Sequence, residues 1–301
     1  MIENILIDKK GSSIEEIPDY VDILAVRQFS EDELERRTRR LLYITGETCK
    51  LNLERGDWVR KENRTLVQLP KMARIVIYNA SGVIHFVTGL SPMEHLFEKV
   101  DRREELIKLI VDMGERLSIN NWIPENDKLS FERLWQIKAA AADSKGNMID
   151  PVLCRIVGAY RHFVNDIPVW GPASVAIKLA GGSQLDSLTV HVRESTGKVI
   201  DQVKIIDPEQ AARQIMAQVN GLIGQKDIRD TKGIKPSYFE FGYLSLPKRK
   251  VQRVLAPVFI AGVEIHNEEA QAYQMIVPAS EREFLTLCRS GNEVMTNRQR
   301  K

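Results

Sequence analysis

The chain has few cysteines, no long apolar run and no marked excess of charge of either sign. Its 301 residues include only three cysteines, Cys49, Cys154 and Cys288. Three widely separated cysteines provide neither a disulfide framework nor the clustered ligands of a zinc site, so we expect free, buried thiols in a reducing compartment. No apolar stretch reaches the roughly 20 residues that a membrane-spanning helix needs.

The charges are almost balanced. Lysine and arginine number 43 and aspartate and glutamate 41, which gives a formal net charge of +2. This balance produces no general attraction to nucleic acid or to an acidic membrane. The first residues, MIENILIDKK, lack the basic start, apolar core and cleavage site of a secretory signal. We therefore expect a soluble cytoplasmic protein without a nucleic-acid or membrane partner.

Helix and strand patterns alternate in the first part of the chain. Ser30 is followed by three acidic residues, and this pattern predicts a helix that ends at Gly46. Residues 73–89 place a turn sequence between β-branched runs and predict a β-hairpin. Residues 91–118 are helical in pattern, with a break near Asp101.

The second part repeats the order helix, strands, helix. A helix is expected to open near Leu129, in SFERLWQIKAAAADSKG. The other elements expected here are strands over 154–164, 167–180, 184–193 and 198–206, a helix over 207–222, and further strands within 237–279. These patterns predict an α+β fold of antiparallel sheets wrapped on helices. We expect two tandem units, residues 1–125 and 126–289, and a flexible tail over 290–301.

The sequence contains none of the common catalytic motifs. H-E-x-x-H, G-x-S-x-G and the phosphate-binding loop are all missing. Two serine–lysine spacings, Ser174 with Lys178 and Ser195 with Lys198, are more simply explained by a strand face and by turn chemistry. We therefore predict no metal, no cofactor and no catalytic residue, and a non-catalytic protein is favoured over an enzyme.

Basic and aromatic residues supply the other candidates for a site. The arginines at 36, 37, 39 and 40 follow glutamates at 31, 33 and 35, which predicts a solvated helix face with pairs four residues apart. Lys248, Arg249 and Lys250 form a charged hairpin tip that could contact an acidic partner or simply solubilise a turn. Trp170 lies between two prolines at a strand bend, where a large aromatic is usually core but could also line a groove.

The segment RHFVNDIPVWGPASVAIKLAGGSQLDSLTVHV resembles the FTP and PepSY propeptide domains of thermolysin-type and fungalysin-type metalloproteases. Residues 165–171 match the family's "G-[IV]-P-V-x-G" step, with Asp166 in place of the usual glycine. Residues 175–179 match the next strand, 209–212 a helix start, and 255–259 the late "L-x-P-V-[YWF]" strand. The resemblance covers about residues 130–280. It implies a cystatin-like sheet wrapped on a helix, which the family uses to bind and inhibit or chaperone a protease.

The leading hypothesis is a peptide- or protein-binding module of tandem cystatin-like units. It would act by strand addition at a sheet edge or in a groove between sheet and helix. The candidate contacts are Arg161, Phe163, Trp170, Lys248, Arg249 and Lys250. The first alternative is an enzyme or accessory protein of peptide natural-product maturation, with scattered site residues such as His162, His191 and Glu194. The second is a structural subunit that forms a homo-oligomer through an exposed apolar patch.

Overall fold

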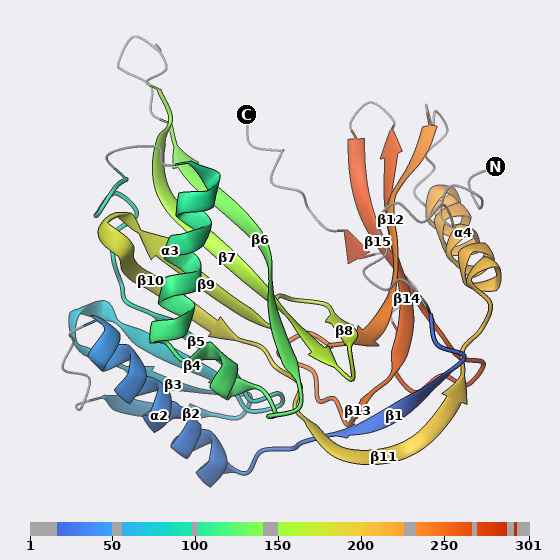
Figure 1. Ribbon diagram of the computed structural model, residues 1–301, viewed down its shortest axis with the longest axis horizontal. Coiled ribbons are helices and arrows are strands. Elements are labelled where there is room, and N and C mark those ends of the chain that lie inside the picture. The colour runs from blue at the N-terminus through green and yellow to red at the C-terminus, as the bar shows by residue number, and fades with distance from the viewer. Residues whose placement is uncertain are drawn as a thin grey trace. The chain divides into compact units, whose positions relative to one another are not determined.

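The computed structural model describes residues 17–49, 56–97, 102–140, 150–225, 233–266, 270–287 and 292–293. The chain is α+β with antiparallel strand pairing, as the patterns predicted (Figure 1). It forms two units. The larger unit contains residues 26–195 and 245–253, and the smaller unit contains the remaining residues. This division differs from the expected one, because the expected boundary after residue 125 lies inside the larger unit.

The larger unit consists of two modules, each a helix followed by antiparallel strands. Module A contains α2 (Glu31–Cys49), β2 (Asp57–Lys61), β3 (Arg64–Gln68), β4 (Arg74–Tyr78) and β5 (Val83–Val87). Module B contains α3 (Arg103–Arg116), β6 (Lys128–Ala139), β7 (Val152–Val164), β8 (Ile167–Trp170), β9 (Val175–Ala180) and β10 (Gln184–Val190). The modules share one sheet, because β5 pairs with β10 and places Phe86 opposite Leu188.

One face of this sheet forms the core of the larger unit. The strand register aligns one row of inward-facing positions across the sheet: Val67, Ile75, Phe86, Leu188, Ile177, Gly158 and Leu134. Leu41 of α2 and Ile110 of α3 are fully buried in the same apolar cluster. A Cβ atom on Gly158 would lie 2.1 Å from Cγ2 of Ile110, so α3 packs directly on the backbone of β7.

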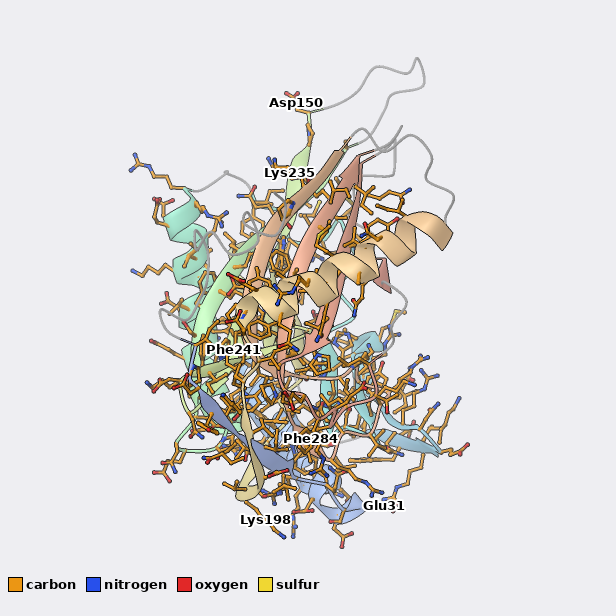
Figure 2. The ribbon with its side chains drawn as sticks, turned by 90° about the vertical axis from the view of Figure 1, so that its right-hand side faces the viewer. Glu31, Asp150, Lys198, Lys235, Phe241 and Phe284 are labelled. Atoms are coloured by element: carbon orange, nitrogen blue, oxygen red, sulfur yellow. The ribbon has the colours of Figure 1, made fainter. Side chains whose placement is uncertain are left out.

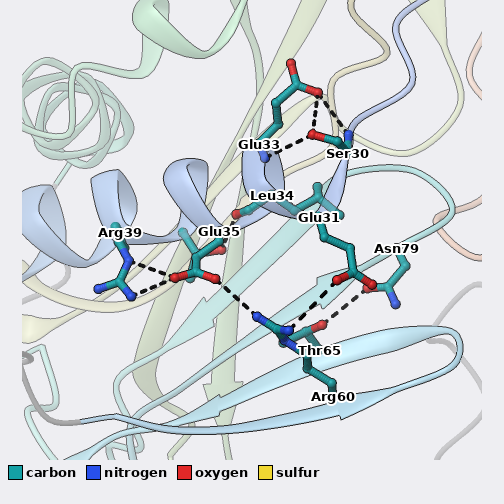
Figure 3. Close-up of polar contacts among 10 residues, drawn as sticks. Ser30, Glu31, Glu33, Leu34, Glu35, Arg39, Arg60, Thr65 and Asn79 are labelled. Atoms are coloured by element: carbon teal, nitrogen blue, oxygen red, sulfur yellow. Dashed lines mark hydrogen bonds and ion pairs between the residues drawn. The ribbon is translucent and has the colours of Figure 1, made fainter.

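The start of α2 is built as the sequence predicted (Figure 3). The backbone N–H of Glu33 donates to the Ser30 hydroxyl at 3.3 Å, and the Glu33 carboxylate accepts from the backbone N–H of Ser30 at 2.9 Å. This capping box satisfies N–H groups that the first turn leaves without partners. The helix continues beyond the predicted end at Gly46 and reaches Cys49.

The helix expected near Leu129 is wrong, because residues 128–139 form strand β6. A β-bulge explains the error. Phe131 pairs with Tyr160 and Arg133 pairs with Ala159, so Glu132 is an extra residue without a partner in the register. Leu129 and Phe131 face inward before this bulge, and Leu134 is the inward residue after it. Apolar residues three apart then resemble the period of a helix.

The helix expected from residue 91 begins only at Arg103. Residues 91–95 form turns held by Arg155, which donates to the main-chain carbonyls of Ser91, Pro92 and Glu94. Arg155 is buried, and its Nε lies 2.9 Å from the carboxylate of Asp186. This bonding explains why a buried cation is tolerated in β7.

The smaller unit contains a third helix followed by antiparallel strands. Its elements are β1 (Tyr20–Val26), β11 (Ser195–Lys204), α4 (Pro208–Gln225), β12 (Gly233–Leu244), β13 (Val254–Leu255), β14 (Pro257–His266), β15 (Ala270–Pro278) and β16 (Asn292–Glu293). Four of its strands pair in the order β16-β15-β14-β12, and a separate three-stranded sheet has the order β11-β1-β13. The helix predicted over 207–222 is confirmed, with Ala211, Ile215 and Val219 fully buried. A helix followed by antiparallel strands thus occurs three times in the described chain, whereas the predicted order was helix, strands, helix.

Candidate functional site

Strand β6 forms an edge of the sheet in the larger unit. It pairs with β7 from Lys128, opposite Phe163, to Ala139, opposite Val152. Within the parts of the chain that the structure describes, no strand pairs with its other side. An edge strand presents a row of N–H and C=O groups that a further strand can pair with. β6 is 12 residues long, so this row is longer than that of an average strand.

Exposed apolar side chains gather at one end of this edge. Trp135 is 45% exposed, Ile137 44% and Val152 37%. The register places Trp135 opposite Val157, whose neighbour Gly158 faces α3. Successive side chains of a strand point to opposite faces, so Trp135 lies on the face away from α3. An apolar cluster beside open main-chain groups is the combination that a bound β-strand uses.

The bulge in β6 brings two predicted binding residues into one cluster. The extra residue, Glu132, accepts two hydrogen bonds of 2.7 Å from Nη2 of Arg161 on β7. Nη1 of Arg161 donates to the carbonyl of Val169 at 3.0 Å, and the guanidinium lies 4.6 Å from the ring centroid of Trp170. Arg161 is only 8% exposed. It therefore holds β6, β7 and β8 together, and a ligand would meet Trp170 more readily than Arg161.

The cluster lies on the same face of the sheet as Trp135. Positions 157, 161 and 163 of β7 have the same parity, so the half-buried Phe163 points to this face too. Asn165 and Asp166 join β7 to β8 with positive φ angles of 52° and 63°, the conformation of a tight hairpin turn. The carboxylate of Asp166 lies 2.5 Å from Nζ of Lys128 at the start of β6.

The predicted cationic tip, residues 248–250, is a turn whose main chain is hydrogen-bonded by the buried side chain of Arg193. Nη2 of Arg193 donates to the carbonyls of Leu246, Pro247 and Lys250 at 2.9, 3.1 and 3.0 Å. Burial lowers the pKa of Arg193 to about 10. Lys248, Arg249 and Lys250 are exposed, and Nζ of Lys248 lies 4.6 Å from the ring centroid of Tyr78.

His191 is held neutral beside this turn. Its Nε2 lies 3.1 Å from the carbonyl of Leu246, and a carbonyl only accepts, so Nε2 carries the proton. Burial lowers the pKa of His191 to about 4, and the nearby charge of Arg193 acts in the same direction. The histidine is therefore uncharged at neutral pH.

The other residues named for an enzyme have separate partners. Nε2 of His162 lies 2.7 Å from the carboxylate of Asp127 in the interior, and the backbone N–H of His162 donates to the Ser174 hydroxyl. That hydroxyl therefore contacts the main chain of His162 and not its ring. Glu194 forms ion pairs with Arg37 and, at 3.6 Å, with Arg27. Among the described residues, no group of three or more histidine, cysteine or acidic side chains is arranged to hold a metal ion.

The basic run on α2 has two different roles. Arg39 pairs with Glu35 four residues earlier, as predicted for a solvated face. Arg37 was predicted wrongly, because its side chain is only 17% exposed. It pairs with Glu194 and lies 4.5 Å from the ring centroid of Phe29. The difference arises because Glu194, which follows β10, supplies a distant acidic partner that local sequence cannot show.

The thiols are free, as predicted, where the structure describes them. Cys154 is buried, and Cys49 is half-buried. Burial raises the pKa of Cys49 to about 11, which makes its thiol a poor nucleophile at neutral pH. Cys288 lies outside the described residues.

Sequence reasoning missed Trp135 and Glu132, since both were assigned to a helix. One signal was available: residues 128–131, Lys-Leu-Ser-Phe, alternate polar and apolar side chains as a half-buried strand does. The bulge that follows hides this alternation, and the exposure of Trp135 depends on β6 lying at the edge of the sheet.

Comparison with known proteins gives a fold but no function. No protein-family model matches the chain, and no curated protein matches it. A crystal structure of an uncharacterized protein from Eubacterium rectale ATCC 33656 is similar, with a TM-score of 0.52 and 14% sequence identity. The similarity covers 91% of this chain and 88% of that one. The described helices include none long and apolar enough to cross a bilayer. The comparison therefore shows a similar fold in a protein that is itself uncharacterized.

Proposed function

We propose that this protein is a non-catalytic module that binds a peptide or an extended segment of a partner protein by strand addition at β6. The observation that carries the proposal is the 12-residue open edge with Trp135 and Ile137 exposed beside it. The main-chain groups would provide affinity and the apolar side chains selectivity. The resemblance to PepSY propeptide domains, with its cystatin-like binding fold, is part of the same proposal.

The charges at the edge favour an acidic ligand. Two of the four charged residues of β6 already have partners, because Glu132 binds Arg161 and Lys128 binds Asp166. The other two, Arg133 and Lys138, are exposed cations. The guanidinium of Arg133 lies 5.6 Å from the ring centroid of Trp135. A segment that alternates β-branched and acidic residues would pair with the edge and complement these charges.

Fluorescence anisotropy with a designed probe tests the proposal. The probe is a labelled peptide of about ten residues in which valine alternates with glutamate, long enough to pair along most of β6. We expect Trp135→Lys to weaken its binding at least about tenfold, because the loss of the exposed aromatic contact outweighs the attraction between the added lysine and the acidic probe. The matched control is Val59→Lys on β2, an edge residue that is 44% exposed.

Two further comparisons separate strand addition from other modes of binding. A probe with proline at alternate positions cannot donate the main-chain hydrogen bonds and should bind far more weakly. Trp135→Lys should unfold at the same urea concentration as the wild type, because exposed substitutions change stability by less than about 0.5 kcal/mol. Equal affinity of the wild type and Trp135→Lys, or equal binding of the proline probe, would contradict the proposal.

A further inference from the structure

The smaller unit contains a groove between helix α4 and strand β15, which is separate from the β6 edge. Its volume is about 650 Å³, within the range of sites that hold a small ligand or a few residues of peptide. Ile276 of β15 contributes to its floor, and glutamines of α4 and acidic residues after β15 contribute to its walls. Figure 2 shows α4 crossing in front of the strands of this unit.

The helix wall is a row of amides. Gln210, Gln214 and Gln218 all line the groove, and their spacing of four residues places them on one face of α4. Nε2 of Gln218 donates to the main-chain carbonyl of Ile276 at 3.1 Å, so this glutamine fastens the helix to the strand. Gln210 and Gln214 are exposed in the groove. Each amide can both donate and accept, which suits the N–H and C=O groups of a peptide main chain.

The opposite wall is acidic and is held in place before any ligand binds. Glu281 and Glu283 line the groove, and none of the described residues that line it is lysine or arginine. The Ser280 hydroxyl donates to the carbonyl of Arg282 at 2.8 Å, and the guanidinium of Arg282 lies 3.0 Å from Asp201 on β11. The wall therefore presents negative charge from a braced segment, which lowers the ordering cost of binding.

We infer that this groove binds a peptide segment that carries lysine or arginine. The cationic side chain would lie against Glu281, and the peptide main chain would exchange hydrogen bonds with Gln210 and Gln214. The ligand differs in charge from the one proposed for β6, so the two sites can be tested independently in the full-length protein.

The test measures anisotropy of a labelled peptide of about ten residues in which lysine alternates with alanine, at low salt where charge contacts are least screened. Glu281→Lys should weaken its binding at least about fivefold. Glu209→Lys should change it less than about twofold, because Glu209 is an exposed acid of α4 that does not line the groove. Gln214→Lys should also weaken binding, whereas Asn220→Lys, an exposed change on the same helix, should not.

Other outcomes overturn the inference. Equal losses in Glu281→Lys and Glu209→Lys would mean that the peptide responds only to overall charge. A loss in Trp135→Lys with none in Glu281→Lys would place the lysine peptide at β6. No binding of the lysine peptide, or equal binding of its glutamate counterpart, would also refute a cation-selective groove. Failure of the β6 proposal is read separately, from the valine–glutamate probe and Trp135→Lys.

Discussion

Modules A and B each consist of a helix followed by antiparallel strands, but their edge strands differ. β2, the edge of module A, has five residues, and Nη2 of Arg60 lies 3.2 Å from Glu35 of α2 (Figure 3). β6, the edge of module B, has 12 residues and exposes Trp135. Short edges and charges tied to a helix are devices that limit unwanted strand pairing. The two edges therefore differ in length and in the exposed aromatic side chain that β6 carries.

The helices of the two modules also pack differently. Val67 of β3 and Gly158 of β7 occupy corresponding positions in the inward row, each on the second strand from its edge. In module B the missing side chain lets α3 approach the strand, so Ile110 fills the space that a side chain at 158 would occupy. The fit of module B therefore depends on a position that has no side chain.

The largest expected effect comes from giving module B a side chain at this position. Gly158→Ala should lower the free energy of unfolding by about 3 kcal/mol, because the new Cβ meets Ile110 in a packed core. Urea denaturation measures the change. Combining it with Ile110→Ala should cost less than the sum of the two single changes, because the second substitution removes the clash. Simple additivity of the two costs would contradict this account of the packing.

The next largest expected effect is a dependence of the free energy of unfolding on pH, caused by the buried His191 that follows β10. The pKa of His191 is lowered from 6.5 to about 4 by burial. Between pH 4 and pH 6.5 this histidine is protonated in the unfolded chain but not in the native protein. Its contribution to the free energy of unfolding is therefore fully present above pH 6.5 and is lost as the pH falls toward 4. The loss should be roughly 2–3 kcal/mol.

His191→Asn should flatten this part of the curve of unfolding free energy against pH. His85 of module A provides the comparison. Burial also lowers its pKa, with Lys248, Lys178 and Arg74 as further causes, but its ring is only half-buried. We therefore expect a smaller change from His85→Asn. Identical curves for the wild type and His191→Asn would rule out His191 as the titrating group.

The smallest expected effect concerns the cluster beside β6. Trp170→Ala should lower stability by roughly 1–2 kcal/mol, because Arg161 loses the aromatic ring beneath it but keeps Glu132 and the Val169 carbonyl. The valine–glutamate probe should bind more weakly to a protein that still unfolds cooperatively. A variant that does not fold would instead show that Trp170 belongs to the core, and the binding residues would then lie elsewhere on the edge.

The sequence predicted well where local chemistry and periodicity act together. The start of α2 at Ser30, the hairpin of β4 and β5, and α4 all follow from caps, turn residues and the spacing of apolar side chains. Of the predicted binding residues, Arg161 and Trp170 are in contact, and that contact follows from the tight turn at Asn165 and Asp166. Such features depend on residues close together in the chain.

The sequence by itself determined the α+β class, the helix caps and the tight turns, because these depend on neighbouring residues. Only the tertiary structure decided that residues 128–139 form an edge strand and that Glu132 reaches Arg161, since a single bulge residue shifts the whole alternation. It also decided that Arg37 is buried by Glu194, 157 residues later in the chain. Pairing and burial of this kind arise from contacts between distant segments, whose partners local patterns do not specify.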